Sequence, residues 1–115
     1  MKKVISLLVL VFLVAATPAL AATKSITVIN KSEKAITAVE VAPYNSGDWI
    51  QLLNDGDTVE PGKSKKFSFE RKDIVKWDLL LVVDGEEGIW DDLDMRSNSR
   101  FTYTIEDDGE YIEWQ

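Results

Sequence analysis

Hydrophobic and polar residues alternate with a period of two in several short stretches of this chain, and that pattern predicts β-strands. The clearest stretch, residues 64–70, places Phe67 and Phe69 on one face and polar side chains on the other. Residues 77–83 are apolar on both faces after Asp78, as expected for a central or covered strand. We expect further strands over residues 25–30, 35–42, 87–91, 100–106 and 110–114.

Two of these stretches carry more detailed predictions. In residues 35–42, Ile36 falls out of phase with the two valines that follow, which indicates a β-bulge near Ala38. In residues 100–106, alternation with threonine should turn three side chains toward one face, those of Phe101, Tyr103 and Ile105.

Asp-Gly pairs separate several of the runs and favour tight reversals of the chain. Asp84-Gly85 and Asp108-Gly109 predict two hairpins. No window shows the 3.6-residue period of a helix, and we expect at most one helical turn in each of residues 73–76 and 92–98. The predicted fold class is therefore all-β: a small antiparallel β-sandwich, immunoglobulin-like or related, with about seven to eight short strands.

The first 21 residues have the pattern of a cleaved secretory signal. Two lysines precede an apolar run over residues 4–16, and Ala19-Leu20-Ala21 fits a signal-peptidase site before Ala22. The alternative is an uncleaved membrane anchor, but a span needs about 20 apolar residues. No Cys follows the run, so lipidation at a mature N-terminal Cys is excluded. We expect one domain over residues 22–115, in the periplasm or secreted from a bacterium.

Composition narrows the chemistry further. The 115 residues include no His and no Cys, which removes the commonest general base, the thiol nucleophile, the preferred zinc ligands and any disulfide. Without the two lysines of the leader the chain has 11 basic and 20 acidic residues, a net charge of −9. Such a domain should bind neither nucleic acid nor an anionic membrane surface. The four tryptophans are interpreted as core mass that replaces the missing disulfides.

The acidic residues concentrate in the second half of the chain. Residues 78–115 carry 12 acidic and 2 basic groups, whereas residues 22–77 carry 8 acidic and 9 basic groups. In one interpretation this uneven charge only keeps the protein soluble. In the other, the acidic half binds a cation or a basic partner. Calcium takes six to eight oxygen ligands, and four carboxylates here could supply some of them: Asp48, Asp91, Asp92 and Asp94. The alternative is that these aspartates only form turns.

The connection over residues 43–49 is a second candidate. It is long and polar and contains Tyr44, Asp48 and Trp49, and such loops on a rigid scaffold often bind partners. In the alternative interpretation, Trp49 tucks under the loop and caps the sandwich while Asp48 fixes a turn. Carboxylate pairs could also hydrolyse a glycoside, but that would require Asp91 or Asp92 to face another acid across a concave pocket.

The order of these features resembles a family of small exported bacterial β-sandwich proteins whose function is not established. The resemblance covers about 65 residues, and its most specific part is the loop Ser46-Gly47-Asp48-Trp49 followed by Val59-Glu60-Pro61-Gly62-Lys63-Ser64. It continues through Phe67-Ser68-Phe69, Trp77-Asp78-Leu79 and the segment 89–94. It implies a compact sandwich and offers no catalytic residues to carry over. Many members of that family have a Cys pair where this chain has Val75 or Lys76 and Arg96, so here the fold must be stable without that bridge.

Together these observations predict an exported, non-catalytic binding or accessory protein of the cell envelope, with no bound cofactor. Its partner would be an unidentified protein or envelope ligand, and it would have no stable membrane association after removal of the leader. The predicted contact residues are Tyr44, Asp48, Trp49, Trp90, Asp91, Asp92 and Asp94. The alternatives are a Ca²⁺-stabilised β-sandwich module and a small carboxylate-based hydrolase.

Overall fold

The structure, a computed structural model, describes residues 23–115 as eight strands and no helix. The predicted signal peptide, residues 1–21, lies outside the described residues. The strands are β1 (Thr23–Asn30), β2 (Ile36–Pro43), β3 (Ile50–Gln51), β4 (Ser64–Glu70), β5 (Lys76–Val83), β6 (Glu86–Asp94), β7 (Arg100–Glu106) and β8 (Gly109–Trp114).

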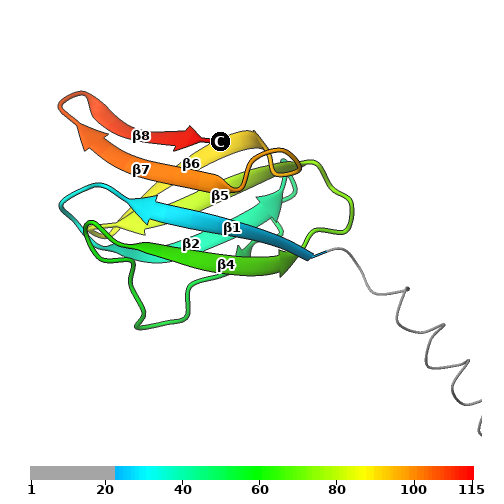
Figure 1. Ribbon diagram of the computed structural model, residues 1–115, viewed down its shortest axis with the longest axis horizontal. Helices are drawn as coiled ribbons and strands as arrows, with labels where there is room; N and C mark the ends of the chain where they lie inside the picture. Colours follow the sequence, from blue (N-terminus) through cyan, green and yellow to red (C-terminus); the bar gives the residue numbers. More distant parts are fainter. Residues whose placement is uncertain (1–22) are drawn as a thin grey trace, which may run out of the picture.

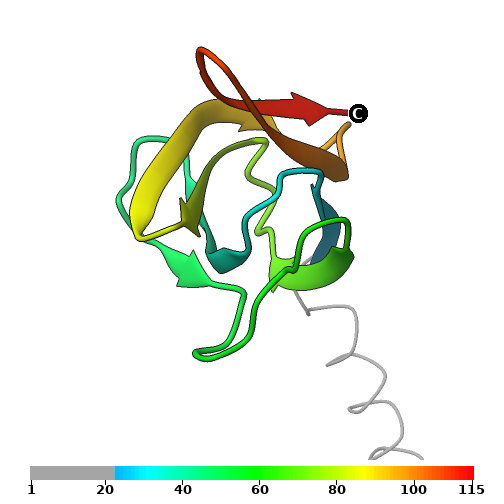
Figure 2. The ribbon, with the colours of Figure 1, turned by 90° about the vertical axis from the view of Figure 1, so that its left-hand side faces the viewer.

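Two four-stranded sheets face each other, with the orders β4-β1-β7-β8 and β3-β2-β5-β6. Figure 1 shows the first sheet in front and the second behind it, and Figure 2 shows the two layers after a quarter turn. The prediction of an all-β sandwich with seven to eight strands is confirmed. One neighbouring pair, β1 and β7, runs parallel, with Val28 beside Phe101. Two parallel neighbours need a long connection. Here the chain between β1 and β7 provides it, because it forms the strands of the other sheet on the way.

Both predicted hairpins and the predicted bulge are present. β5 and β6 are joined by Asp84 and Gly85 at φ of 55° and 77°, the two positive values that a two-residue hairpin turn favours. The register of β2 against β5 shifts between Ile36 and Ala38. Neither of the two possible helical turns forms. The chain makes simple turns at residues 72–73 and 95–97, and the second segment begins in strand β6, which continues as far as Asp94.

The inner faces of the two sheets carry alternating apolar side chains that form one core. Phe67 and Phe69 are buried as the alternation predicts, and Phe69 meets the ring of Trp77 edge to face at 5.0 Å. The interpretation of all four tryptophans as core is wrong. Trp77 alone is fully buried, Trp49 and Trp90 are partly exposed, and Trp114 is half exposed on the outer edge of its sheet.

Ile105 also departs from the prediction, since 41 % of it is exposed although Phe101 and Tyr103 are buried on the same strand. It lies next to the turn of the β7–β8 hairpin, whose tip projects past the opposite sheet in Figure 1. Apolar alternation along a strand therefore overstates burial at the end of that strand.

A buried asparagine joins the β1–β2 turn to the rest of the molecule. The side-chain amide nitrogen of Asn30 donates to the carbonyls of Lys34 at 2.7 Å and Val59 at 2.9 Å. Its Oδ1 accepts from the backbone N–H of Ser32 at 2.9 Å and from the hydroxyl of Ser32 at 2.7 Å. Asn30 has no exposed surface, so these four bonds satisfy every polar atom of its side chain.

Residues 23–115 contain no helix long and apolar enough to cross a membrane.

Candidate functional site

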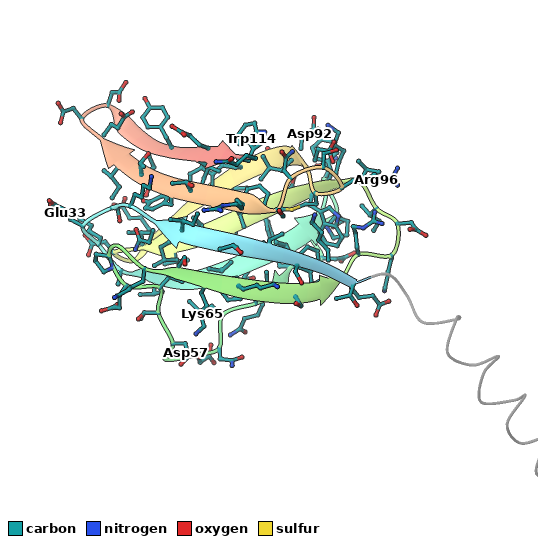
Figure 3. All side chains as sticks on the ribbon, in the orientation of Figure 1. Glu33, Asp57, Lys65, Asp92, Arg96 and Trp114 are labelled. Atoms are coloured by element: carbon teal, nitrogen blue, oxygen red, sulfur yellow. The ribbon has the colours of Figure 1, made fainter. Side chains whose placement is uncertain are left out.

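The 44–49 loop and the end of β6 lie at the same end of the second sheet. The loop leaves β2 after Pro43, which pairs with Trp77 at the start of β5, and Trp77 pairs in turn with Leu93 near the end of β6. Figure 3 labels Asp92 and Arg96 at this end of the molecule. We call the residues 44–49 and 91–94 the end surface.

A nearly buried carboxylate joins the two halves of the end surface. Asp78 is 6 % exposed, and its Oδ2 accepts the backbone N–H of Asn45 at 3.0 Å. Its Oδ1 accepts the backbone N–H of Asp92 at 3.1 Å. Both donors have positive φ, 59° at Asn45 and 60° at Asp92, a conformation that residues other than glycine seldom adopt. One side chain therefore holds two strained backbone positions from two different elements.

A β-bulge in β6 explains why Asp92 needs this acceptor. Trp77 pairs with Leu93 and Leu79 pairs with Trp90, so Asp78 alone stands opposite both Asp91 and Asp92. A bulge leaves its extra residue out of the ladder, and the carboxylate of Asp78 replaces the missing backbone acceptor. The sequence showed Asp78 only as a polar residue that opens an apolar strand. A carboxylate at the start of an apolar strand was the signal in the sequence that Asp78 has a structural role.

Five of the seven predicted contact residues lie in two segments, the 44–49 loop and the bulge of β6. Tyr44 is 52 % exposed, Asp48 is exposed, and Trp49 is partly exposed just before β3. Asp91 and Asp92 are exposed at the bulge, where Asp92 approaches Lys76 Nζ at 3.7 Å. The loop spans the sheet, since Tyr44 donates its N–H to Lys76 of β5 whereas Trp49 leads into β3 beyond β2. The residues of the end surface thus extend across one end of the second sheet, from β3 to β6.

Trp90 does not join the end surface. Its ring lies 6.1 Å from that of Tyr103 on the facing sheet, edge to face, and packs against the core. Gly88 makes room for this arrangement, because a Cβ there would lie 2.8 Å from the Trp90 ring. Trp90 therefore closes the sandwich between its two sheets.

Asp94 completes a turn rather than facing outward as a free ligand. Its Oδ1 accepts the backbone N–H groups of Arg96 at 2.8 Å and Ser97 at 3.1 Å. These hydrogen bonds, the one from Ser97 first, lower the pKa of Asp94 below its ordinary value of 3.8, and the charge of Lys76 adds to the effect. No group of three or more acidic side chains in the described part of the chain is placed to hold a metal ion. The four carboxylates of the calcium prediction are not gathered into one ligand set.

The lowered pKa of Asp94 predicts a pH dependence. Because the folded-state pKa is depressed, the carboxylate stabilises the fold fully above its unfolded-state pKa, and this contribution is lost as the pH falls through the folded-state pKa. We expect the difference in unfolding free energy between the wild type and Asp94→Asn to shrink on acidification through this range. Urea titrations at a series of pH values would measure it, and a difference that grows in acid would contradict the assignment.

Two hollows lie at the opposite end of the molecule. The larger, of about 390 Å³, is lined by residues that include Lys34, Asp84, Glu86 and Glu110. Ile105 lines both it and the smaller one of about 310 Å³. Neither hollow is lined by Asp91 or Asp92, so the carboxylates of the hydrolase prediction do not face a partner acid across either of them. Lys34 Nζ bonds Asp84 at 3.1 Å, and both side chains are largely exposed.

Comparisons with known proteins support the fold alone. No family model and no curated protein match this chain. Among solved structures, it is similar to the NMR structure of a protein from Eubacterium rectale, with a TM-score of 0.55 and 19 % identity. The match covers 81 % of this chain and 86 % of that one.

Proposed function

We propose that this chain is an exported, non-catalytic binding module of the cell envelope and that it contacts its partner through the end surface. The observation that carries the proposal is the double hydrogen bond of Asp78, which fixes the loop and the β6 bulge relative to each other. A surface held in this way loses little conformational entropy on binding. The export step rests on the leader pattern of residues 1–21, which lie outside the described residues.

The chemistry of the end surface favours a partner that presents cationic side chains beside apolar ones. Tyr44 and Trp49 offer aromatic surface at low entropy cost, and the exposed carboxylates of Asp48, Asp91 and Asp92 give the end surface a negative charge. Asp92 already approaches Lys76 at the margin of this surface. A lysine or arginine of the partner would meet the same kind of environment there.

The test is capture of an envelope partner by the immobilised protein. Alanine at Tyr44, Asp48 and Trp49 together should weaken capture by about tenfold or more, because aromatic anchors carry most of the energy of an interface. These side chains are exposed or partly exposed, so the melting temperature should change little.

The control carries three alanines at the other end of the sandwich, in place of Ile105, Asp107 and Asp108. These residues are also exposed, and the control removes two charges and one apolar side chain without touching the end surface. Equal capture by the wild type and the end-surface variant would refute the proposal. A specific loss in that variant, with capture by the control intact, would support it.

A further inference from the structure

The first sheet ends in two strands of opposite charge. β4 begins with Ser64-Lys65-Lys66, whereas β8 carries Glu110 and Glu113 and no basic residue. Each is the outer strand of the sheet β4-β1-β7-β8. Figure 3 shows Lys65 at the lower edge of this sheet and Trp114 at the upper edge. Two copies of β8 side by side would repel each other, as would two copies of β4, but β4 and β8 attract.

The free backbone groups of the two edges can be derived from the ladder inside the sheet. Arg100 and Gln115 exchange both backbone bonds, at 2.9 and 3.0 Å. Because bonding directions alternate along a strand, Tyr111 and Glu113 also face β7, and the N–H and C=O groups of Ile112 point away from the sheet. On the other edge Asn30 bonds Lys63 and Gly62, at 2.9 and 2.8 Å, and the same alternation leaves the backbone groups of Lys66 and Ser68 pointing outward.

These directions fit parallel addition of one edge to the other. In a parallel pair, a residue bonds to both neighbours of the residue beside it, as Thr27 of β1 does when it donates to Ser99 while lying beside Arg100. If Ile112 lies beside Phe67 of a second copy, its N–H meets the carbonyl of Lys66 and its carbonyl meets the N–H of Ser68. Both edges then bond through the backbone groups that their own sheet leaves free.

The same register matches the side chains. The residues on the inner face of β8 would lie beside those on the inner face of β4, as the pairs Glu110 with Lys65, Ile112 with Phe67, and Trp114 with Phe69. Trp114 is 50 % exposed although it belongs to the inner face, and it would lie beside Phe69 of the second copy. Within one copy, Lys65 Nζ lies 3.8 Å from Asp57 Oδ2. Since both groups are exposed, this ion pair contributes little to stability, and Lys65 can exchange it for Glu110 of another copy.

We propose that this chain associates with further copies of itself head to tail, β8 of one copy adding in parallel to β4 of the next. β4 and β8 run in the same direction within the sheet, because β1 and β7 are parallel and each outer strand is antiparallel to its neighbour. The pairing therefore extends the sheet without turning a copy over. It joins two different edges, so each addition leaves a free edge for the next. The net charge of −9 opposes association, and about 0.15 M salt screens it beyond roughly 8 Å.

Sedimentation velocity of the exported protein over a range of concentrations, at about 0.15 M salt, tests this. The weight-average sedimentation coefficient of the wild type should rise continuously with concentration. Lys65→Glu and Glu110→Lys should each weaken association by about tenfold or more, because each places like charges side by side. An equimolar mixture of the two variants should associate again, since every contact between them joins a Glu to a Lys. Lys72→Glu, outside β4, makes the same change in net charge as Lys65→Glu and should behave as the wild type.

A second variant guards against a failure to fold, because Glu110 also accepts a hydrogen bond from the Tyr103 hydroxyl. Ser68→Pro removes an outward N–H that the monomer does not use, so it should abolish association while leaving the charges intact. Near-ultraviolet circular dichroism verifies the fold of each variant. A wild type that stays monomeric at every concentration, a dimer that adds no third copy, or a mixture that does not associate would each overturn the proposal.

Discussion

Asn30→Asp should destabilise the protein by about 3–6 kcal/mol near neutral pH, a large part of the 5–15 kcal/mol typical of a whole domain. The substitution keeps the shape of the side chain but replaces the two N–H donors that reach the carbonyls of Lys34 and Val59. Those carbonyls would then face a carboxylate oxygen in a site with no exposed surface. Urea unfolding followed by tryptophan fluorescence measures the loss.

Acid should partly reverse this effect. Burial next to carbonyl oxygens raises the folded-state pKa of the new carboxyl above its unfolded value, so the penalty is largest above the folded pKa and declines as the pH falls through it. Asn98→Asp is the matched control, because Asn98 also donates to a carbonyl, that of Asp94 at 2.9 Å, but from a partly exposed site. It should cost less than about 1 kcal/mol. Equal losses in the two variants would contradict the role given to Asn30.

Asp78→Ala should cost about 2–4 kcal/mol and should release both halves of the end surface at once. The variant leaves the N–H groups of Asn45 and Asp92 without their acceptor, although both residues remain in a strained conformation. Amide hydrogen exchange should therefore accelerate at both positions. At Leu81, in the centre of the same strand and buried on the other face, it should accelerate no more than the loss of global stability requires.

Asp48→Ala provides the comparison for Asp78→Ala, since Asp48 is an exposed carboxylate of the same surface. It should leave stability within about 0.5 kcal/mol of the wild type. Exchange that accelerates at Asn45 but not at Asp92 would show that Asp78 supports the loop alone, contrary to the structure.

Features governed by neighbours in sequence could be predicted from the sequence. The bulge at Ala38 followed from one apolar residue out of phase, and the turn at Asp84-Gly85 followed from the conformations that Asp and Gly tolerate. The burial of Phe67 and Phe69 followed from alternation in the middle of a strand. Each depends on a few consecutive residues, so the pattern contains the information.

Features that depend on the distant parts of the chain were missed. Nothing near β1 or β7 indicates that these strands lie side by side, about seventy residues apart, and in parallel. Trp114 and Trp90 have the same apolar character, yet one is exposed at a sheet edge and the other closes the sandwich. The difference arises from strand order, which periodicity does not encode.

The candidate site shows the same division. The composition of the 44–49 loop led to the proposal of Tyr44, Asp48 and Trp49 as contact residues, because loops rich in aromatic and polar residues recur in binding surfaces. The part played by Asp78 could not be predicted, since it requires a bulge in β6 to stand opposite β5. A carboxylate at the start of an apolar strand is the trace that this arrangement leaves in the sequence.

The central place of β1 in its sheet has a consequence for the order in which the protein can fold. β1 is the first strand in the chain, but one of its two neighbours is β7, which begins at Arg100. A chain that emerges N-terminus first from a ribosome or a translocation channel cannot complete this sheet until almost all of it has passed through. Contacts so distant in sequence slow folding, and the first sheet stays incomplete while the polypeptide is still in transit.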